Sequence, residues 1–413
     1  MTICYIDYET YSEVDLPQAG AHNYCADHTF KPLLLAYAFG DDPVKVFQFS
    51  EGFPFELPEA VVVHAAGDGV FCAHGQFDRF CLNRSLIQCG FRLPISRYID
   101  TSVLASEVGL PPSLLGASTA MKLDVRKNPM GKKCIKTFAI PDPVEGRRFP
   151  DYDIEMWDIF VDYAKDDVEI CRQLHQKLPG LPPVEKKLYE LDTRINDRGI
   201  RVDLPAVKRF NKLAKAAVKD LNRQVAEVTD GEIQTTGQVA KIAEYLGITS
   251  CAEKALDAAL ESGELNDKQT AVARIRLDGA RTSTKKLPKM ISGAYFIDQR
   301  CRGQLQFCGT HTKRWAGRGF QPHNLPRESF KPDVVDDVVE TVRKTGSLPD
   351  QLDALKTISM CLRGMVIPAP GHILAPADYS QIEARLVAWY AGQTDALAIY
   401  DSGGDIYKEM AST

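Results

Sequence analysis

The sequence has 413 residues, which is too long for one ordinary core and predicts roughly two to three domains. Its hydrophobic fraction of 44% and charged fraction of 25% are those of a folded globular chain, which excludes a disordered protein. No apolar run has the length of a bilayer-spanning helix and the N-terminus has no basic leader, so we expect a cytoplasmic protein with no membrane partner.

Charge and cysteine usage restrict the class of partner and of metal. The formal net charge of −5 does not exclude nucleic acid, because local fields decide such binding. Residues 126–148, 268–289 and 302–327 form three strongly basic stretches. Any one of them is ordinarily a solvated surface, but three favour contact with phosphates. The eleven cysteines contain no C-x-x-C pair, so neither a zinc site nor a disulfide framework is expected.

The first part of the chain has the pattern of a mixed sheet flanked by helices. Strands are predicted at residues 2–8, 33–39, 44–49 and 70–73, and helices near 57–65, from Gln76 onwards and over 152–178. A turn at residues 40–43 joins the second and third strands into a hairpin. Because strands and helices alternate after this hairpin, we expect an α/β domain over residues 1–180, ending at Pro179-Gly180.

The rest of the chain changes character. Residues 184–292 are predicted to be mainly helical, with a turn near Gly247, and a second region is expected over residues 181–300. Strand character returns around residues 304–308 and again at 372–378, so a third, α+β region is expected over residues 301–413.

Two carboxylates, Asp7 and Glu9, lie near the end of the first predicted strand. Because side chains alternate along a strand, both project from the same face and can share a cation. Beside a buried strand such a pair is unfavourable unless a metal ion or hydrogen bonds neutralise it. An edge strand with two solvated acids remains the alternative for this motif alone.

Two helices supply further acids. Asp78 follows the strand at 70–73, and on its own it is interpreted as a first-turn acid favoured by the helix dipole. Tyr163 and Asp167 are four residues apart and therefore share one face of the helix predicted over 152–178. That face continues towards the core through Phe160, Cys171 and Leu174.

Together, Asp7-Tyr8-Glu9-Thr10, Phe77-Asp78 and Tyr163-x-x-x-Asp167 resemble the three motifs of proofreading 3′→5′ exonuclease domains of the tyrosine subclass. Their order and spacing match across residues 7–167, and the combination is far more specific than any single motif. The resemblance implies an RNase H-like fold and DNA with a single-stranded 3′ end as substrate. One departure is His74, where relatives commonly have asparagine.

The chemistry of that family requires such a set of residues. Phosphodiester hydrolysis needs an activated water and a clamp on developing charge, which two divalent ions about 4 Å apart supply. Hard ions such as Mg²⁺ or Mn²⁺ prefer carboxylate oxygens. We therefore assign Asp7, Glu9, Asp78 and Asp167 as ligands of two ions, and the resemblance implies that Tyr163 orients the attacking water.

A second acidic segment, Asp378-Tyr379-Ser380-Gln381-Ile382-Glu383-Ala384-Arg385, is predicted to run from a strand into a helix. Ser380 and Glu383 have the spacing of a capping box, which explains Glu383 structurally but leaves Asp378 unexplained. The segment strongly resembles motif A of family A (polymerase I-like) DNA polymerases. The resemblance implies that Asp378 is a catalytic metal ligand, that Tyr379, Gln381 and Glu383 contact the nucleotide, with Glu383 as a gate against the ribose 2′-hydroxyl, and that Arg385 contacts DNA.

Two further segments resemble the same family. Residues 191–203 are similar to its palm-entry segment, and residues 312–315 with 321–326 to its primer-template minor-groove motif. The latter points to Arg314 and Asn324 as DNA-binding residues, and the helical stretch between the two segments resembles a thumb. The implied fold is an RNase H-like mixed-sheet exonuclease domain followed by a mainly helical thumb and a partial α+β palm.

The family pattern stops after motif A. The fingers helix and the H-D-E motif are absent before Thr413, so we expect no polymerisation by this chain alone, and dNTP binding only with a complementing C-terminal polypeptide. Three interpretations remain open: a truncated or split polymerase with intact proofreading, a stand-alone exonuclease with a DNA-gripping region, and a noncatalytic DNA-binding protein. The lack of an evident N-terminal 5′-nuclease looks phage-like by analogy, which would place the protein in a host cytoplasm.

Overall fold

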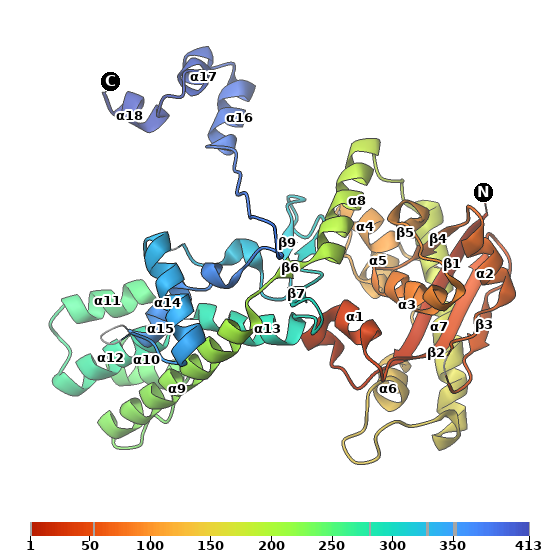
Figure 1. Cartoon of the computed structure of the whole chain (residues 1–413), viewed down its shortest axis with the longest axis horizontal. Coiled ribbons are helices and arrows are strands. Elements are labelled where there is room, and N and C mark those ends of the chain that lie inside the picture. The colour runs from red at the N-terminus through yellow and green to blue at the C-terminus, as the bar shows by residue number, and fades with distance from the viewer. Residues whose placement is uncertain (1, 53, 281, 328–329, 350–352, 413) are drawn as a thin grey trace. The chain divides into compact units, whose positions relative to one another are not determined.

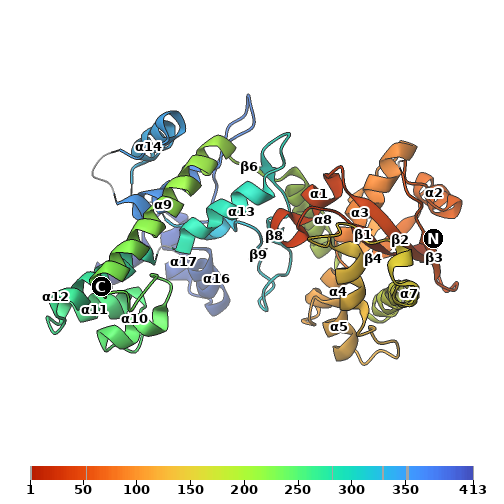
Figure 2. The same cartoon turned by 90° about the horizontal axis from the view of Figure 1, so that it is seen from below.

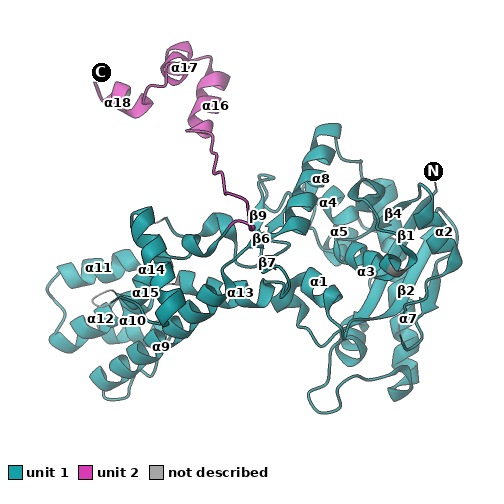
Figure 3. Cartoon of the chain, viewed as in Figure 1, with its two compact units in different colours: residues 1–367 teal, residues 368–413 magenta. Residues whose placement is uncertain are grey.

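A computed structural model describes residues 2–52, 54–280, 282–327, 330–349 and 353–412. The chain divides into two compact units, Met1–Ile367 and Pro368–Thr413 (Figure 3). The domain boundaries predicted at 180/181 and 300/301 both fall inside the first unit and stay predictions.

A five-stranded mixed sheet forms the N-terminal part of the first unit (Figure 1). In the order in which they pair, its strands are β3 (Lys45–Gln48), β2 (Lys31–Phe39), β1 (Ile3–Tyr11), β4 (Val70–Ala73) and β5 (Tyr98–Asp100). The β1–β2 and β2–β3 pairs are antiparallel, whereas β1–β4 and β4–β5 are parallel. The predicted hairpin and mixed sheet are thus confirmed.

Alternation along β1 divides its side chains between two cores. Cys4, Ile6 and Tyr8 pack with helices α2 (Glu59–Ala66) and α3 (Phe77–Leu86). Tyr5 and Tyr11 pack instead with helix α7 (Ile154–Lys177). Because odd and even positions point to opposite faces of a strand, every odd-numbered side chain of β1 near its middle lies on the α7 side.

Helix α7 packs against one face of this sheet, and local sequence features explain where the helix begins. Asp153 caps it by accepting a hydrogen bond from the Met156 backbone N–H at 3.0 Å, a contact that typically contributes about 1 kcal/mol. Its C-terminal half packs through Ile170 and Leu174 against two short helices. The remaining elements of this part are α1 (Leu16–Ala26), α4 (Thr101–Glu107), α5 (Leu114–Ala120) and α6 (Gly131–Cys134).

The second part of the first unit is mainly helical, as predicted. Its helices are α8 (Pro183–Arg198), α9 (Leu204–Val228), α10 (Val239–Leu246), α11 (Glu253–Glu261), α12 (Asp267–Gly279), α13 (Lys286–Gly293), α14 (Pro332–Thr345) and α15 (Ala354–Met360). Short strands β6 (Ile200–Arg201) and β7 (Arg300–Cys301) pair with each other, as do β8 (Leu305–Gln306) and β9 (Ala316–Gly317). Gly199 at φ 71° and Gly247 at φ 68° end two of the helices, a conformation that glycine adopts without strain.

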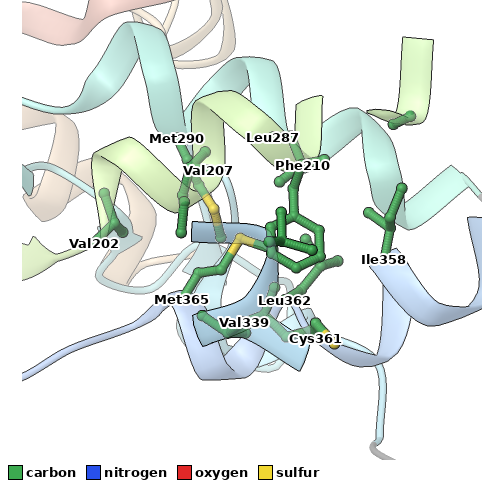
Figure 4. Close-up of a cluster of buried hydrophobic side chains, with 14 of the residues drawn as sticks. Val202, Val207, Phe210, Leu287, Met290, Val339, Ile358, Cys361, Leu362 and Met365 are labelled. Atoms are coloured by element: carbon green, nitrogen blue, oxygen red, sulfur yellow. The ribbon is translucent and has the colours of Figure 1, made fainter. Parts of the chain in front are cut away.

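A hydrophobic core centred on α9 holds this helical part together. Phe210 is fully buried among Val207, Leu287 and Met290, which Figure 4 shows converging from α9 and α13, and Leu362 closes the cluster. Helices α9 and α13 lie side by side in two perpendicular views (Figures 1 and 2). In the part of the chain that the structure describes, no helix combines the length and apolar composition needed to cross a bilayer.

The second unit contains helices α16 (Ile382–Ala391), α17 (Thr394–Asp401) and α18 (Ile406–Ser412) around a small cluster of buried side chains. The strand predicted at 372–378 is wrong, because residues 373–378 are exposed and form no strand. A strand needs a neighbour for its backbone N–H and C=O groups, and no strand among the described residues pairs with this segment.

The predicted capping box is also wrong. Helix α16 begins at Ile382, and its cap position is Gln381, at φ 54°, with no side-chain hydrogen bond to the helix N-terminus. A capping box needs the helix to start directly after the serine with that serine in an extended conformation, and here the helix starts one residue too late.

Candidate active site

Strand β1 carries Asp7 and Glu9 on the face that packs against α7. Asp7 lies opposite Ala36 and Glu9 opposite Leu34 on β2, so the cross-strand neighbours of the two carboxylates are apolar. Glu9 is only 8% exposed and Asp7 is partly buried. The pair predicted from alternation therefore lies on a buried central strand, and the edge-strand alternative is excluded.

Helix α3 brings Asp78 to the same strand. Its carboxylate accepts a hydrogen bond of 2.9 Å from the backbone N–H of Tyr8, the residue between Asp7 and Glu9, and Asp78 is 5% exposed. The first-turn position explains where Asp78 sits on its helix, but a contact with β1 is not something the helix dipole requires. The tertiary contact favours a role in a shared site.

Helix α7 contributes Tyr163 and Asp167 from one buried face. Asp167 is 4% exposed and Tyr163 is 3% exposed. The Tyr163 ring stacks on Phe160 at a centroid separation of 6.3 Å, and Gly131 at the start of α6 lies directly against the ring. This packing holds the tyrosine in one orientation beside the acids.

Burial and the neighbouring carboxylates raise the pKa values of these acids. The pKa of Asp7 is raised well above its usual value by burial and then by the charges of Asp78, Asp167 and Glu9. The pKa of Glu9 is raised by burial and by the charge of Asp167. Burial raises the pKa of Asp78 to about 7, although the Tyr8 backbone N–H lowers it. Such a cluster is unfavourable without a cation.

A lysine that the motifs do not include supplies positive charge. The Lys127 ammonium pairs with Asp167 Oδ2 and lies 4.6 Å from the centroid of the Tyr163 ring. Lys127 belongs to the basic stretch 126–148, so composition indicated a cation here, but nothing local linked it to a residue forty positions later. Sequence reasoning did not place Lys127 at this cluster.

The acids fit hard divalent ions. The donor set consists of carboxylates, which such ions prefer, and the buried Asp167 Oδ1 has no hydrogen-bond partner. Across the described residues, however, no three His, Cys, Asp or Glu side chains lie close enough together to form a finished metal site. In this arrangement the Lys127 ammonium pairs with Asp167 Oδ2.

His74 lies next to this cluster without joining it. Its Nε2 donates to the Pro112 carbonyl at 2.9 Å, and its Nδ1 is 2.9 Å from the Thr101 hydroxyl. Burial lowers its pKa, which favours the neutral ring. The side chain therefore ties the segment before Asp78 to α4 and to the loop after it.

The predicted DNA-binding residues of the first unit lie in its 305–326 region. Arg314 and Asn324 are both exposed. Next to Arg314, the Trp315 indole N–H donates to Asp192 on α8 at 2.8 Å, which anchors the segment that carries Arg314.

The second unit holds the residues of the motif A segment. Asp378, Tyr379 and Glu383 are exposed, and Gln381 is partly buried. Arg385 donates to the Ser380 carbonyl at 2.9 Å and lies over the Tyr400 ring at 4.5 Å. Arg385 thus joins the motif to α17.

Comparison with known proteins first defines the class of fold. No family model matches the chain. A solved structure of the POL domain of Pol1 from M. smegmatis, in complex with DNA primer-template and dNTP, covers 98% of this chain and 61% of its own, with a TM-score of 0.57 at 14% identity. The chain has the fold of a polymerase domain.

A curated relative then gives the more particular relationship. The DNA polymerase of Bacillus phage SP02 is 34% identical over 427 aligned residues, which cover 98% of this chain and 64% of the relative. The chain is a homologue of a phage DNA polymerase and spans about 64% of its length. The expected resemblance to polymerase I-like enzymes is confirmed.

Proposed function

We propose that this chain is part of a family A DNA polymerase and that its N-terminal region removes nucleotides from the 3′ end of DNA as a proofreading exonuclease. The single observation that carries the nuclease proposal is geometric: Asp78 on α3 accepts a hydrogen bond from the β1 backbone between Asp7 and Glu9, and the face of β1 with these two acids packs against α7, which carries Asp167. In this proposal residues 1–180 form an RNase H-like domain, followed by a thumb and part of a palm.

Each residue has a role in the proposed hydrolysis. The four carboxylates would hold two Mg²⁺ or Mn²⁺ ions, which when bound supply an activated water and stabilise charge on the phosphate. Burial and the nearby carboxylates raise the pKa of Tyr163, so its hydroxyl keeps its proton and can hydrogen-bond the attacking water. The packing of Tyr163 against Phe160 and Gly131 fixes where that hydroxyl points.

The polymerase half of the proposal rests on the relatives. The phage homologue is named a DNA polymerase, and the structural neighbour binds primer-template and dNTP. By that likeness Arg314, Asn324 and Arg385 would contact DNA. Asp378 would bind metal, and Tyr379, Gln381 and Glu383 would contact the nucleotide in a complete polymerase site.

Digestion of a 5′-labelled single-stranded oligonucleotide tests the nuclease. We expect Mg²⁺-dependent shortening from the 3′ end that the Asp7→Ala with Glu9→Ala variant abolishes, because both ligands on β1 are lost. A matched control replaces the exposed adjacent acids Asp41 and Asp42 with alanine and keeps the activity. Equal activity of the β1 variant and the wild type would remove the assignment. DNA binding without digestion by the wild type would favour a noncatalytic binding protein.

A further inference from the structure

Helix α8 lies outside the proposed exonuclease domain but contacts the segment that carries Asp78. The guanidinium of Arg79 forms a two-point ion pair with Asp197 on α8, at 3.0 Å between Nη1 and Oδ2 and 2.7 Å between Nη2 and Oδ1. Arg79 is only 3% exposed. A paired guanidinium and carboxylate fix both distance and orientation, so this contact sets the position of the residue directly after Asp78.

A second contact from α8 holds the start of the same segment. The hydroxyl of Tyr189 donates to Asp100 Oδ2 at 2.9 Å. The other oxygen, Asp100 Oδ1, accepts the backbone N–H groups of Gly75 and Ser102, each at 2.9 Å. Gly75 has φ 106°, a conformation that residues other than glycine rarely adopt. The glycine backbone and its hydrogen bond to Asp100 therefore fix the conformation of this turn.

The side chain of Gln76 links the two contacts. Its amide nitrogen bonds to the Tyr189 hydroxyl and its amide oxygen accepts from Arg79 Nε. A cavity of about 250 Å³ adjoins these groups and is lined by Gln76, Arg79, Tyr189 and Asp197 among others. The segment 75–79 is therefore tied to α8 at both ends, with Asp78 between the ties.

We propose that Tyr189 and Asp197 are positioning residues for Asp78, so that α8 sets the geometry of the nuclease site from outside that domain. The inference rests on the proposed function. It adds that contacts from α8 hold one proposed metal ligand, Asp78, in position. Groups that orient a ligand from behind commonly change metal affinity about 10- to 100-fold when removed. The same helix holds the chain on both sides of Arg314, because Asn196 accepts from the Leu305 backbone N–H and Asp192 accepts from the Trp315 indole N–H. Both proposed DNA sites therefore contact α8.

The test uses the full chain with Tyr189→Phe and Asp197→Asn made separately. Matched controls are Tyr152→Phe and Asp220→Asn, which alter an exposed tyrosine and an exposed ion pair. Three readouts are needed: hydrogen exchange of the amides at 75–79, Mn²⁺ affinity by calorimetry, and kcat and KM for single-stranded DNA digestion.

We expect exchange at 75–79 to rise while the amides around Phe210 keep their protection. Mn²⁺ affinity and kcat should each fall about tenfold, because Asp78 is a proposed metal ligand. KM should stay within about twofold of wild type, because both variants keep the Asp192 and Asn196 contacts that hold the Arg314 segment. The controls should match the wild type in all three readouts.

A uniform rise in exchange, with Mn²⁺ affinity and kcat unchanged, would overturn the proposal and leave α8 a purely structural role. If Asp197→Asn fails to fold, Tyr189→Phe decides the matter, since it removes one hydroxyl and keeps the ring. A wild-type protein without nuclease activity would overturn the proposed function, whereas exchange and Mn²⁺ affinity would still decide the positioning role.

Discussion

The Lys127 ammonium and the Asp167 carboxylate form an ion pair beside the Tyr163 ring, in the middle of an otherwise acidic cluster. The charge of Lys127 lowers the pKa of Asp7, Glu9 and Asp167 against the larger effect of burial. We interpret Lys127 as a side-chain cation that partly neutralises the acids when no divalent ion is bound.

Replacing Lys127 by methionine tests this interpretation. In the presence of EDTA we expect the free energy of unfolding to fall by about 1–3 kcal/mol, because Asp167 loses its partner in a buried position. Mn²⁺ should bind more tightly, because the Lys127 ammonium no longer competes with it for the Asp167 carboxylate. Thermal denaturation and calorimetry measure the two effects. Lys165→Met is the control, because it breaks an exposed ion pair with Asp162 on α7, the helix that carries Asp167. Weaker Mn²⁺ binding by Lys127→Met would contradict the interpretation.

Asp197 should give the protein a measurable acid sensitivity. Burial alone raises the pKa of this carboxyl, but the His22 ring, whose Nε2 lies 3.4 Å from Asp197 Oδ1, and the Arg79 guanidinium outweigh burial and lower the pKa from 3.8 to about 2. A depressed folded pKa contributes stability that is complete above the unfolded value and is lost as pH falls, here from about pH 4 to about pH 2.

The Asp197→Asn variant should lose about 2 kcal/mol at pH 6, and its stability should depend less on pH over that acid range. Urea denaturation at a series of pH values measures both effects. An acid limb as steep as that of the wild type would show that other carboxylates cause the sensitivity.

Gly131→Ala tests the packing that orients Tyr163. A Cβ at position 131 would overlap the Tyr163 ring, so either the ring or helix α6 must move. We expect the free energy of unfolding to fall by about 1–3 kcal/mol. We also expect a lower kcat for single-strand digestion, because the Tyr163 hydroxyl moves. Gly180→Ala, where nothing lies within 4 Å of the added carbon, is the matched control. Unchanged kcat in Gly131→Ala would show that the orientation of Tyr163 does not limit the reaction.

Phe210→Ala tests the core of the helical part. The side chain is fully buried in the cluster of Figure 4, so its removal should reduce the free energy of unfolding by about 3–5 kcal/mol. Phe296→Ala, at a ring that is 77% exposed, should stay within about 0.5 kcal/mol of wild type. Urea denaturation compares the two. Similar losses of stability in the two variants would mean that the Phe210 side chain on α9 is not at the centre of the hydrophobic core.

Local patterns carried much of the fold. The strand predicted at 70–73 coincides with β4, and the helix predicted over 152–178 is α7 within two residues at each end. These predictions succeeded because apolar spacing and a Pro-Gly helix end act over a few residues. The strand predicted at 372–378 failed because strand pattern alone does not supply a hydrogen-bonding neighbour.

The sequence by itself determined which residue types were available: acids on β1, α3 and α7 whose order resembles known motifs. Only the tertiary structure decided that Lys127 pairs with Asp167 and that Asp197 pairs with Arg79, partners 40 and 118 positions apart. No periodicity spans such separations, because contacts of this kind arise only when segments distant in the sequence pack together. The physical reason is that a buried charge takes whichever partner the fold places beside it.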